Sequence, residues 1–226
     1  MTDAKRGQNM ERSLAAWQKA VGIPLEIGEV ETPPPGPEEI LVRNRAIAIN
    51  PVDWILQETP IFPWLDYPTI LGSDVSGEVV AVGSNVDRFK VGDRVLGQSV
   101  GATTNSPSHG AFQTHTLILE NMASQLPPSL SFTEAAVLPL GLGTAACGLF
   151  EVDHLALRHP TLTPQPTGEA ILVWGGSSSV GCNAIQLAVA AGYRCVTTAS
   201  ASNMKLVEEL GPAPSSTIPI RKSSIA

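Results

Sequence analysis

The sequence is poor in the features that mark secreted, membrane and disulfide-rich proteins. It has three cysteines, Cys147, Cys182 and Cys195, and no Cys-x-x-Cys pair, so neither a disulfide framework nor a cysteine-built zinc site is predicted. The first twelve residues are polar and lack the apolar run of a signal peptide. No apolar stretch approaches the length of a membrane span. We therefore expect a cytoplasmic protein with no membrane partner.

Positive charge is also scarce. Lys plus Arg is 14 against 21 for Asp plus Glu, which gives a formal net charge of −7. An acidic chain repels phosphate backbones, so no nucleic-acid partner is expected. The chain has 226 residues, of which 43% are hydrophobic, enough for one large domain or two small ones with packed cores.

The first 125 residues have the pattern of a β-rich domain. β-Branched runs between glycines and prolines predict strands at residues 39–49, 75–82, 91–96 and 110–119. Asn50-Pro51 ends the first of them, because proline cannot donate to a strand ladder. This pattern of short β-branched runs between glycines and prolines favours a small barrel-like domain.

The pattern changes after residue 128. Ser131-Phe-Thr-Glu134 is a capping box that predicts a short helix ending before Pro139, and a second helix is predicted at residues 143–151. Residues 154–168 are rich in Pro and Thr and predict a surface loop. A strand at 170–174, a helix at 180–191, a strand at 193–198 and a helix at 202–210 then predict a parallel β-α-β unit.

The turn of that unit has the composition of a dinucleotide-binding loop. Gly175, Gly176 and Gly181 permit a tight turn, close approach to a pyrophosphate and close helix packing, and residues 177–179 are serines. The helix behind the turn offers unpaired N–H groups to a phosphate. On the motif alone, a plain strand-to-helix connection without a ligand is about equally consistent.

The end of the second strand distinguishes between the two nicotinamide cofactors. Binding of NADH usually requires an acidic residue there for the ribose hydroxyl, but residues 196–205 contain no Asp or Glu. Ser200, Ser202, Asn203 and Lys205 would instead favour the 2′-phosphate of NADPH, which is the predicted cofactor. The alternative for Lys205 is an ordinary solvated helix charge.

Several motifs in order resemble the medium-chain dehydrogenase/reductase superfamily. They are Pro24-Leu-Glu-Ile27, Asn50-Pro-Val-Asp-Trp54, Gly72-Ser-Asp-Val-Ser-Gly-Glu78, Val91-Gly-Asp-Arg-Val95 and the Gly175–Gly181 turn. The resemblance covers residues 14 to 211 and is strongest to the zinc-independent, quinone oxidoreductase-like branch, including fungal trans-acting enoyl reductases. It implies an α/β fold: a GroES-like β-rich domain at residues 14–128, then a Rossmann domain, a doubly wound parallel sheet, at residues 129–211.

The same resemblance implies a reaction. Zinc-dependent relatives carry a Cys and a His where this chain has Asn50 and Ser73, so no metal is expected. The implied activity is reduction of an activated C=C bond by NADPH, with a carrier-bound enoyl thioester as substrate and a polyketide synthase as candidate partner. A small quinone or enone is the alternative substrate, and a non-catalytic remnant or binding module is the alternative role. No catalytic residue is identified; His109, His115 and Tyr67 are weak candidates for the proton donor.

The resemblance also assigns site residues. Cofactor contacts are expected at Asn50, Pro51, Val52, Asp53, Gly175, Gly176, Ser177, Ser178, Ser179, Val180, Gly181, Ser200, Ala201, Ser202, Asn203 and Lys205. Substrate contacts are expected at Val137, Leu138, Pro139, Leu140, Gly141, Leu142, Gly143 and Thr144. The structural alternatives are a helix N-cap for Asp53, a core aromatic for Trp54, and a Pro/Gly-bent helix junction for residues 137–144.

The C-terminal end departs from this pattern. A Rossmann domain has six parallel strands, and only two are predicted before Gly211. Residues 212–226 contain three prolines and no strand pattern, so an aberrant or disordered tail and an incomplete, truncated Rossmann domain are expected. The oligomeric state, monomer or dimer, stays open.

Overall fold

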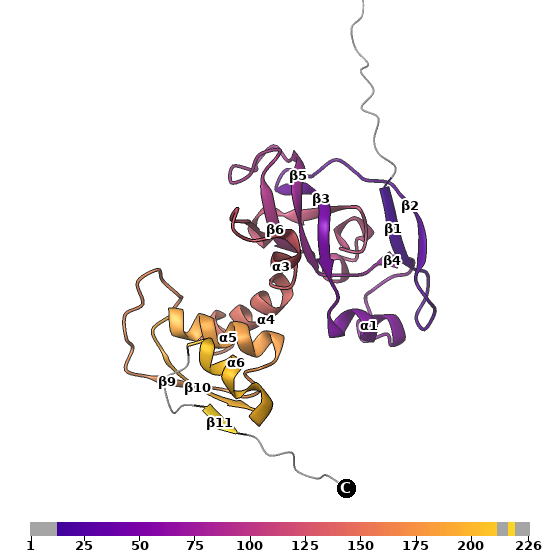
Figure 1. The fold of residues 1–226 in the computed structure, drawn as a ribbon. Helices are drawn as coiled ribbons and strands as arrows, with labels where there is room; N and C mark the ends of the chain where they lie inside the picture. The colour runs from indigo at the N-terminus through magenta and orange to yellow at the C-terminus, as the bar shows by residue number, and fades with distance from the viewer. Residues whose placement is uncertain (1–12, 212–216, 220–226) are drawn as a thin grey trace, which may run out of the picture. The chain divides into compact units, whose positions relative to one another are not determined.

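The computed structural model describes residues 13–211 and 217–219 of the chain. The chain divides into two compact units, of which the first ends at Leu140 and the second begins at Gly141 (Figure 1). We had expected the boundary between residues 128 and 129. It lies further along because the short helix after Ser131 packs against strands of the first unit.

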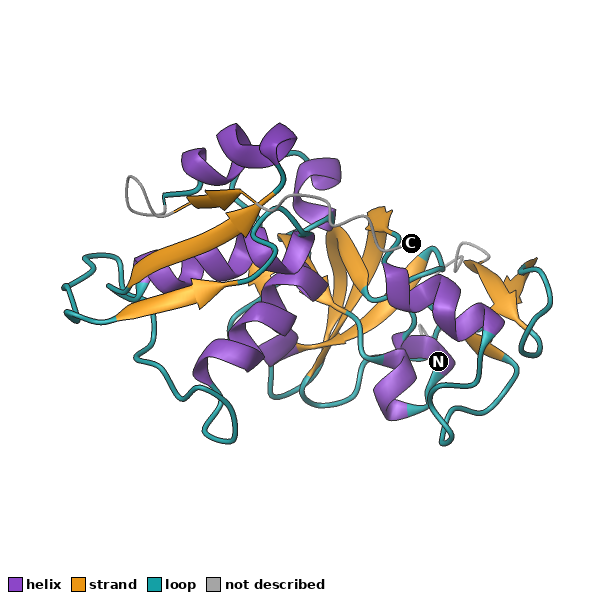
Figure 2. Ribbon diagram, turned by 90° about the horizontal axis from the view of Figure 1, so that it is seen from below, coloured by secondary structure: helices purple, strands orange, loops and turns teal. Residues whose placement is uncertain are grey.

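A five-stranded antiparallel sheet forms the core of the first unit, and its strand order is β7-β3-β5-β6-β8. Its strands are among those drawn in orange in Figure 2. Ile40, Val42, Val75, Val79 and Ile118 alternate inward and are fully buried in it. The predicted strands are confirmed, although β7 begins five residues later than expected. The bounds are β3 (Glu39–Ala48), β5 (Asp74–Val82), β6 (Arg94–Gln98), β7 (His115–Leu119) and β8 (Ala123–Gln125).

A second, three-stranded sheet of order β2-β1-β4 was not predicted. It consists of β1 (Ser13–Gln18), β2 (Glu26–Val30) and β4 (Thr69–Ile70). The sequence signal is weak because β4 has only two residues and β2 is mostly exposed, so it needs no alternating apolar face.

The most consequential missed element is helix α1 (Pro51–Glu58). The sequence predicts the end of a strand at Asn50-Pro51, with a helix N-cap at Asp53 as the structural alternative. Asn50 is the N-cap of α1, Pro51 is its first residue, and the Asp53 carboxylate accepts the Asn50 backbone N–H at 2.7 Å. Asp53 is therefore at the third helical position and is not the N-cap. The other short helices of the unit are α2 (Gly101–Thr104), η1 (Pro107–His109), η2 (Glu120–Met122) and α3 (Phe132–Ala136).

The capping box at Ser131 is confirmed, and α3 ends before Pro139 as expected. Helix α4 (Pro139–Phe150) then begins at the proline, four residues earlier than predicted, because the fixed φ of proline suits a first helical position. Together Phe132–Phe150 form a 19-residue helical stretch of mean hydropathy 1.3, so our expectation that no stretch reaches the length of a membrane span was wrong. Helix α3, the first part of this stretch, packs on β3, β5 and β6.

The second unit contains the predicted β-α-β arrangement. Its parallel sheet has the order β11-β10-β9 (Figure 1), and Ile185, Cys195 and Val207 are fully buried in its core. The bounds are β9 (Ala170–Val173), α5 (Ser179–Ala190), β10 (Arg194–Ala199), η3 (Ala201–Asn203), α6 (Met204–Glu209) and β11 (Thr217–Pro219).

Strand β11 corrects the prediction for the tail. Residues 217–219 pair in parallel with β10, so the tail does contain a strand, and the partial Rossmann sheet has three strands among the described residues. Pairing with a neighbour supplied the backbone partners that the local sequence did not signal. The rest of the predicted tail, residues 212–216 and 220–226, lies outside the described residues.

The packing of helix α4 can be tested at two of its glycines, Gly148 and Gly141. A Cβ added at the exposed Gly148 meets nothing within 4 Å, so Gly148→Ala should stabilise the protein by up to about 1 kcal/mol through helix propensity. Gly141→Ala in the same helix is the matched control, because its Cβ would lie 2.7 Å from the Ser179 hydroxyl oxygen. Chemical denaturation of the full chain measures both. A larger gain at Gly141 than at Gly148 would contradict this packing.

Candidate functional site

The first unit contains a small cavity of about 140 Å³ next to helix α1. Its wall combines apolar side chains with carboxyl, hydroxyl and amide groups. Of the predicted substrate segment 137–144, Leu140 lies in this wall, and of the predicted residues 50–53, Val52 and Asp53 do. The lining residues are Val52, Asp53, Leu56, Phe62, Leu71, Gly72, Ser73, Gln98, Ser99, Val100, Ala102, Thr103 and Leu140.

Asp53 is a buried carboxyl in the cavity wall, only 4% exposed. Its pKa is raised to about 6: burial is the largest cause and the nearby charge of Asp74 adds to it, while hydrogen bonds from the backbone N–H groups of Asn50 and Gly72 act in the opposite direction. The site therefore contains a carboxyl that changes charge within the range in which enzymes commonly operate.

Asp74, the first residue of β5, joins two predicted site segments. Its Oδ2 accepts a hydrogen bond from the Asn50 side-chain amide at 2.9 Å, and its Oδ1 accepts one from the Leu140 backbone N–H at 2.7 Å. Burial raises the pKa of Asp74, and these two hydrogen bonds lower it. Asp74 stands within the Gly72–Glu78 motif, but the sequence pattern assigns it no role. The available signal was a charge at the start of an apolar strand, which must find partners when buried.

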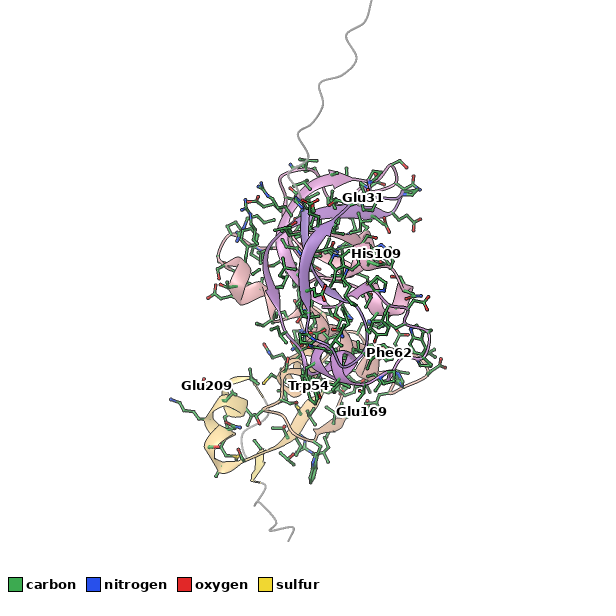
Figure 3. All side chains as sticks on the ribbon, turned by 90° about the vertical axis from the view of Figure 1, so that its right-hand side faces the viewer. Glu31, Trp54, Phe62, His109, Glu169 and Glu209 are labelled. Carbon is green, nitrogen blue, oxygen red and sulfur yellow. The ribbon has the colours of Figure 1, made fainter. Side chains whose placement is uncertain are left out.

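The aromatic residues and candidate proton donors of the first unit differ in where they lie. Trp54 is 53% exposed, so its interpretation as a core aromatic was wrong. Phe62, which sequence reasoning missed, lines the cavity and stacks on Trp64 at 4.9 Å; Trp54 and Phe62 are labelled in Figure 3. Neither His109 nor Tyr67 lines the cavity: His109 lies 2.8 Å from a Glu39 carboxylate oxygen, and the Tyr67 hydroxyl donates to the Leu56 carbonyl at 3.4 Å.

In the second unit, the glycines of the predicted phosphate loop are each required by the backbone. Gly175 has φ +77°, which side-chain-bearing residues rarely adopt. A Cβ at Gly176 would collide with the Thr197 side chain, and one at Gly181 would collide with the Gly175 carbonyl. The turn is therefore tight and closely packed on β10, which are two of the three properties expected of a dinucleotide loop.

The same turn presents unpaired donors. Among the described residues, the backbone N–H groups of Ser177, Ser179 and Val180 have no acceptor, as is usual at the start of a helix. Ser178 is the N-cap of α5: its hydroxyl accepts from the Gly181 N–H at 3.0 Å and donates to the Gly175 carbonyl at 2.9 Å. Its hydroxyl is thus already occupied, contrary to our expectation that all three serine hydroxyls could bind a phosphate.

The end of β10 lies beside this turn. The Asn203 side-chain amide donates to the Ser177 hydroxyl at 3.3 Å, and the Ser200 and Ser202 hydroxyls are 3.1 Å apart. The two segments predicted to contact pyrophosphate and 2′-phosphate are therefore neighbours. Lys205 is 90% exposed and lies 3.9 Å from Glu209, an arrangement typical of a solvated helix charge.

Among the described residues, neither the cavity beside α1 nor the Gly175–Gly181 turn has a group of three His, Cys, Asp or Glu side chains that could hold a metal ion. Ser73 lies in the cavity wall, and the Asn50 amide is bonded to Asp74. At the Gly175–Gly181 turn, the backbone N–H donors, small residues and hydroxyls fit an anionic dinucleotide better than a cation.

Sequence comparison gives fungal relatives that are named dehydrogenases and trans-enoyl reductases. Residues 36–128 match the family model of the alcohol dehydrogenase GroES-like domain. The chain is 52% identical to dehydrogenase pigH of Monascus ruber over 90% of this chain and 57% of that protein. It is 46% identical to the trans-enoyl reductase himH of Aspergillus japonicus over 87% of this chain and 57% of that protein. The chain thus spans somewhat more than half the length of these relatives.

Comparison with solved structures also finds proteins similar to this chain. An alcohol dehydrogenase superfamily protein from Novosphingobium aromaticivorans has a TM-score of 0.76 and 32% identity, covering 92% of this chain and 58% of that chain. A mycobacterial protein in complex with NADPH has a TM-score of 0.66 and 25% identity, covering 93% and 60%. The expected fold class, a GroES-like domain followed by an incomplete Rossmann domain, is confirmed. Over most of its length the chain is therefore similar to dehydrogenases and reductases of the alcohol dehydrogenase superfamily, in agreement with its resemblance to the medium-chain dehydrogenase/reductase superfamily.

Proposed function

We propose that this chain is an NADPH-dependent, zinc-independent oxidoreductase that reduces an activated C=C bond, with an enoyl thioester as substrate. The observation that carries the proposal is the phosphate-binding geometry of the second unit. Unpaired N–H groups at Ser177, Ser179 and Val180 lie beside a strand end that offers Ser200, Ser202 and Asn203 and no carboxylate. The cofactor, when bound, supplies a hydride.

Each group at the turn has a defined role under this proposal. The three N–H groups and the positive end of the α5 dipole would bind the pyrophosphate. The Ser200 and Ser202 hydroxyls and the Asn203 amide would donate to the 2′-phosphate, which a carboxylate at this position would repel. The relative complexed with NADPH supports the choice of a nicotinamide cofactor, and the acid-free strand end supports NADPH over NADH.

The first unit would receive the substrate. Apolar walls from Leu56, Phe62 and Leu71 suit an acyl chain, and excluding water there strengthens polar contacts to the reacting group. The Ser73 hydroxyl, which has no partner among the described residues, is available to donate to a thioester carbonyl oxygen as negative charge develops. The name of the relative himH, a trans-enoyl reductase, supports this substrate class.

The proposal also includes the compartment, the protein partner and the absence of zinc. Three free cysteines support a reducing compartment such as the cytoplasm. A carrier-bound acyl group fits an enzyme of fungal secondary metabolism, so we propose a polyketide synthase as the protein partner. Zinc independence is supported by the bond between the Asn50 amide and Asp74, which occupies the position where zinc-dependent relatives place a ligand.

Fluorescence titration of the full chain with NADPH and NADH tests the cofactor. We expect NADPH to bind at least about tenfold more tightly, as one to two charge-assisted hydrogen bonds predict. Ser202→Asp should remove that preference by repelling the 2′-phosphate, whereas Ser84→Asp, the same change at an exposed serine of the first unit, should leave it. Equal affinity for both cofactors, or binding of neither, would contradict the cofactor assignment.

Turnover tests the substrate. NADPH consumption is measured with a short enoyl thioester and, separately, with a quinone. Oxidation of NADPH by the enoyl thioester is the expected result. Turnover of the quinone alone would replace the proposed substrate, and tight NADPH binding without either reaction would favour a non-catalytic role.

A further inference from the structure

We propose that Asp74 is a positioning residue that fixes the N-terminal ends of helices α1 and α4 to one point of strand β5. Its carboxylate is 1% exposed and makes two hydrogen bonds, one from each helix end. Water cannot replace either bond at that burial. The position of both helix starts therefore depends on one side chain.

The bond to α4 completes a helix end that has no local cap. Leu140 is the second residue of α4, and N–H groups of a first turn lack partners within their own helix. The residue before the helix, Leu138, has no side-chain oxygen to accept such a bond. The Asp74 carboxylate, 66 positions away in sequence, accepts it at 2.7 Å and interacts favourably with the helix dipole.

The bond to α1 fixes the residue that begins this helix. Asn50 is the N-cap, its backbone N–H is held by Asp53 at 2.7 Å, and its side-chain amide donates to Asp74 at 2.9 Å. The segments following these two anchors supply Val52 and Leu140 to the cavity wall. The significance of Asp74 for catalysis rests on the proposed function, whereas its role in holding the two helices does not.

Hydrogen–deuterium exchange of the full chain, without cofactor, measures the role directly. In Asp74→Ala, peptides covering residues 51–58 and 139–145 should exchange about tenfold faster, as expected for loss of a charge-assisted hydrogen bond. Asp74→Asn should restore most of the protection, because its amide oxygen can accept from Leu140 and its NH₂ can donate to the Asn50 amide oxygen once that amide turns. Asn50→Ala should loosen residues 51–58 only.

Val79→Ala is the matched control for a cavity in the same strand. Val79 is also 1% exposed, but it packs in the core of the large sheet, so its loss should not produce faster exchange confined to the two helix starts. The proposal is overturned if Asp74→Ala loosens one helix start or neither, or if Val79→Ala gives the same two-segment pattern.

If Asp74→Ala does not fold, a second pair of variants tests whether Asp74 holds both helix starts. Asn50→Asp sets two carboxylates against each other and should loosen both helix starts. The double variant Asn50→Asp with Asp74→Asn reverses donor and acceptor and should restore both, because the new amide at position 74 still accepts from Leu140. Failure of the double variant to restore protection overturns the proposal. Since no cofactor is added, a failure of the proposed NADPH binding leaves these outcomes interpretable.

Discussion

Gly176→Val should destabilise the second unit by about 3 kcal/mol or more and abolish NADPH binding, because overpacking a tight core turn forces backbone shifts. The added Cβ would collide with the Thr197 side chain and lie 2.8 Å from the Ile185 Cδ1. Thr197 is fully buried, and its hydroxyl donates to the Val173 carbonyl at 2.9 Å, which ties β10 to β9. Moving Thr197 would therefore disturb both strands on either side of the phosphate loop.

Gly148→Val is the matched control for this substitution, because a Cβ at Gly148 meets nothing within 4 Å. Denaturant unfolding measures the stability of both variants, and NADPH titration measures the loop. Wild-type stability and affinity in Gly176→Val would show that the turn is not packed on β10 as described.

Asp53→Asn should become more stable relative to the wild type as the pH rises from 4 to 7. The folded pKa of Asp53 is raised from 3.8 to about 6, so between these values the folded protein binds more protons than the unfolded chain. Stability contributed by the protonated carboxyl is present below pH 4 and is lost as the pH rises through 6. The asparagine keeps the acceptor for the Asn50 N–H without this loss. We expect a relative change of about 2 to 3 kcal/mol across the window.

Urea denaturation of both proteins at pH 4, 5, 6 and 7 measures this difference. Asp87→Asn, which removes an exposed carboxyl from the same unit, gives the baseline for the loss of one negative charge. If Asp53→Asn instead became less stable relative to wild type as the pH rises toward 7, the sign would be wrong and a raised pKa at Asp53 would be excluded.

The geometry of the Gly175–Gly181 turn was predictable because its determinants are local. Gly175, Gly176 and Gly181 are spaced as a strand-to-helix turn requires, and the structure gives each a steric reason. Ser178 was expected to contact the cofactor, whereas its hydroxyl caps α5 in the structure. A serine at the start of a helix satisfies either role, and only the hydrogen-bond geometry distinguishes them.

Helix α1 and strand β11 show where local reasoning fails. Asn50-Pro51 is compatible both with the end of a strand and with the start of a helix, and Asp53 decides between them only through a bond to the Asn50 N–H. Residues 217–219 have no strand pattern of their own and acquire one by pairing with β10. Backbone pairing with an existing strand overrides weak local preference.

The sequence by itself determined the order of a β-rich and a β-α-β part, the glycine positions of the turn and the acid-free end of the second strand. These features depend on periodicity and short spacing, which the chain carries locally. Only the tertiary structure decided that Asp74 holds both Asn50 and Leu140, residues 24 and 66 positions away. A buried carboxylate must find donors wherever the fold supplies them, and no spacing in the sequence states which donors those are.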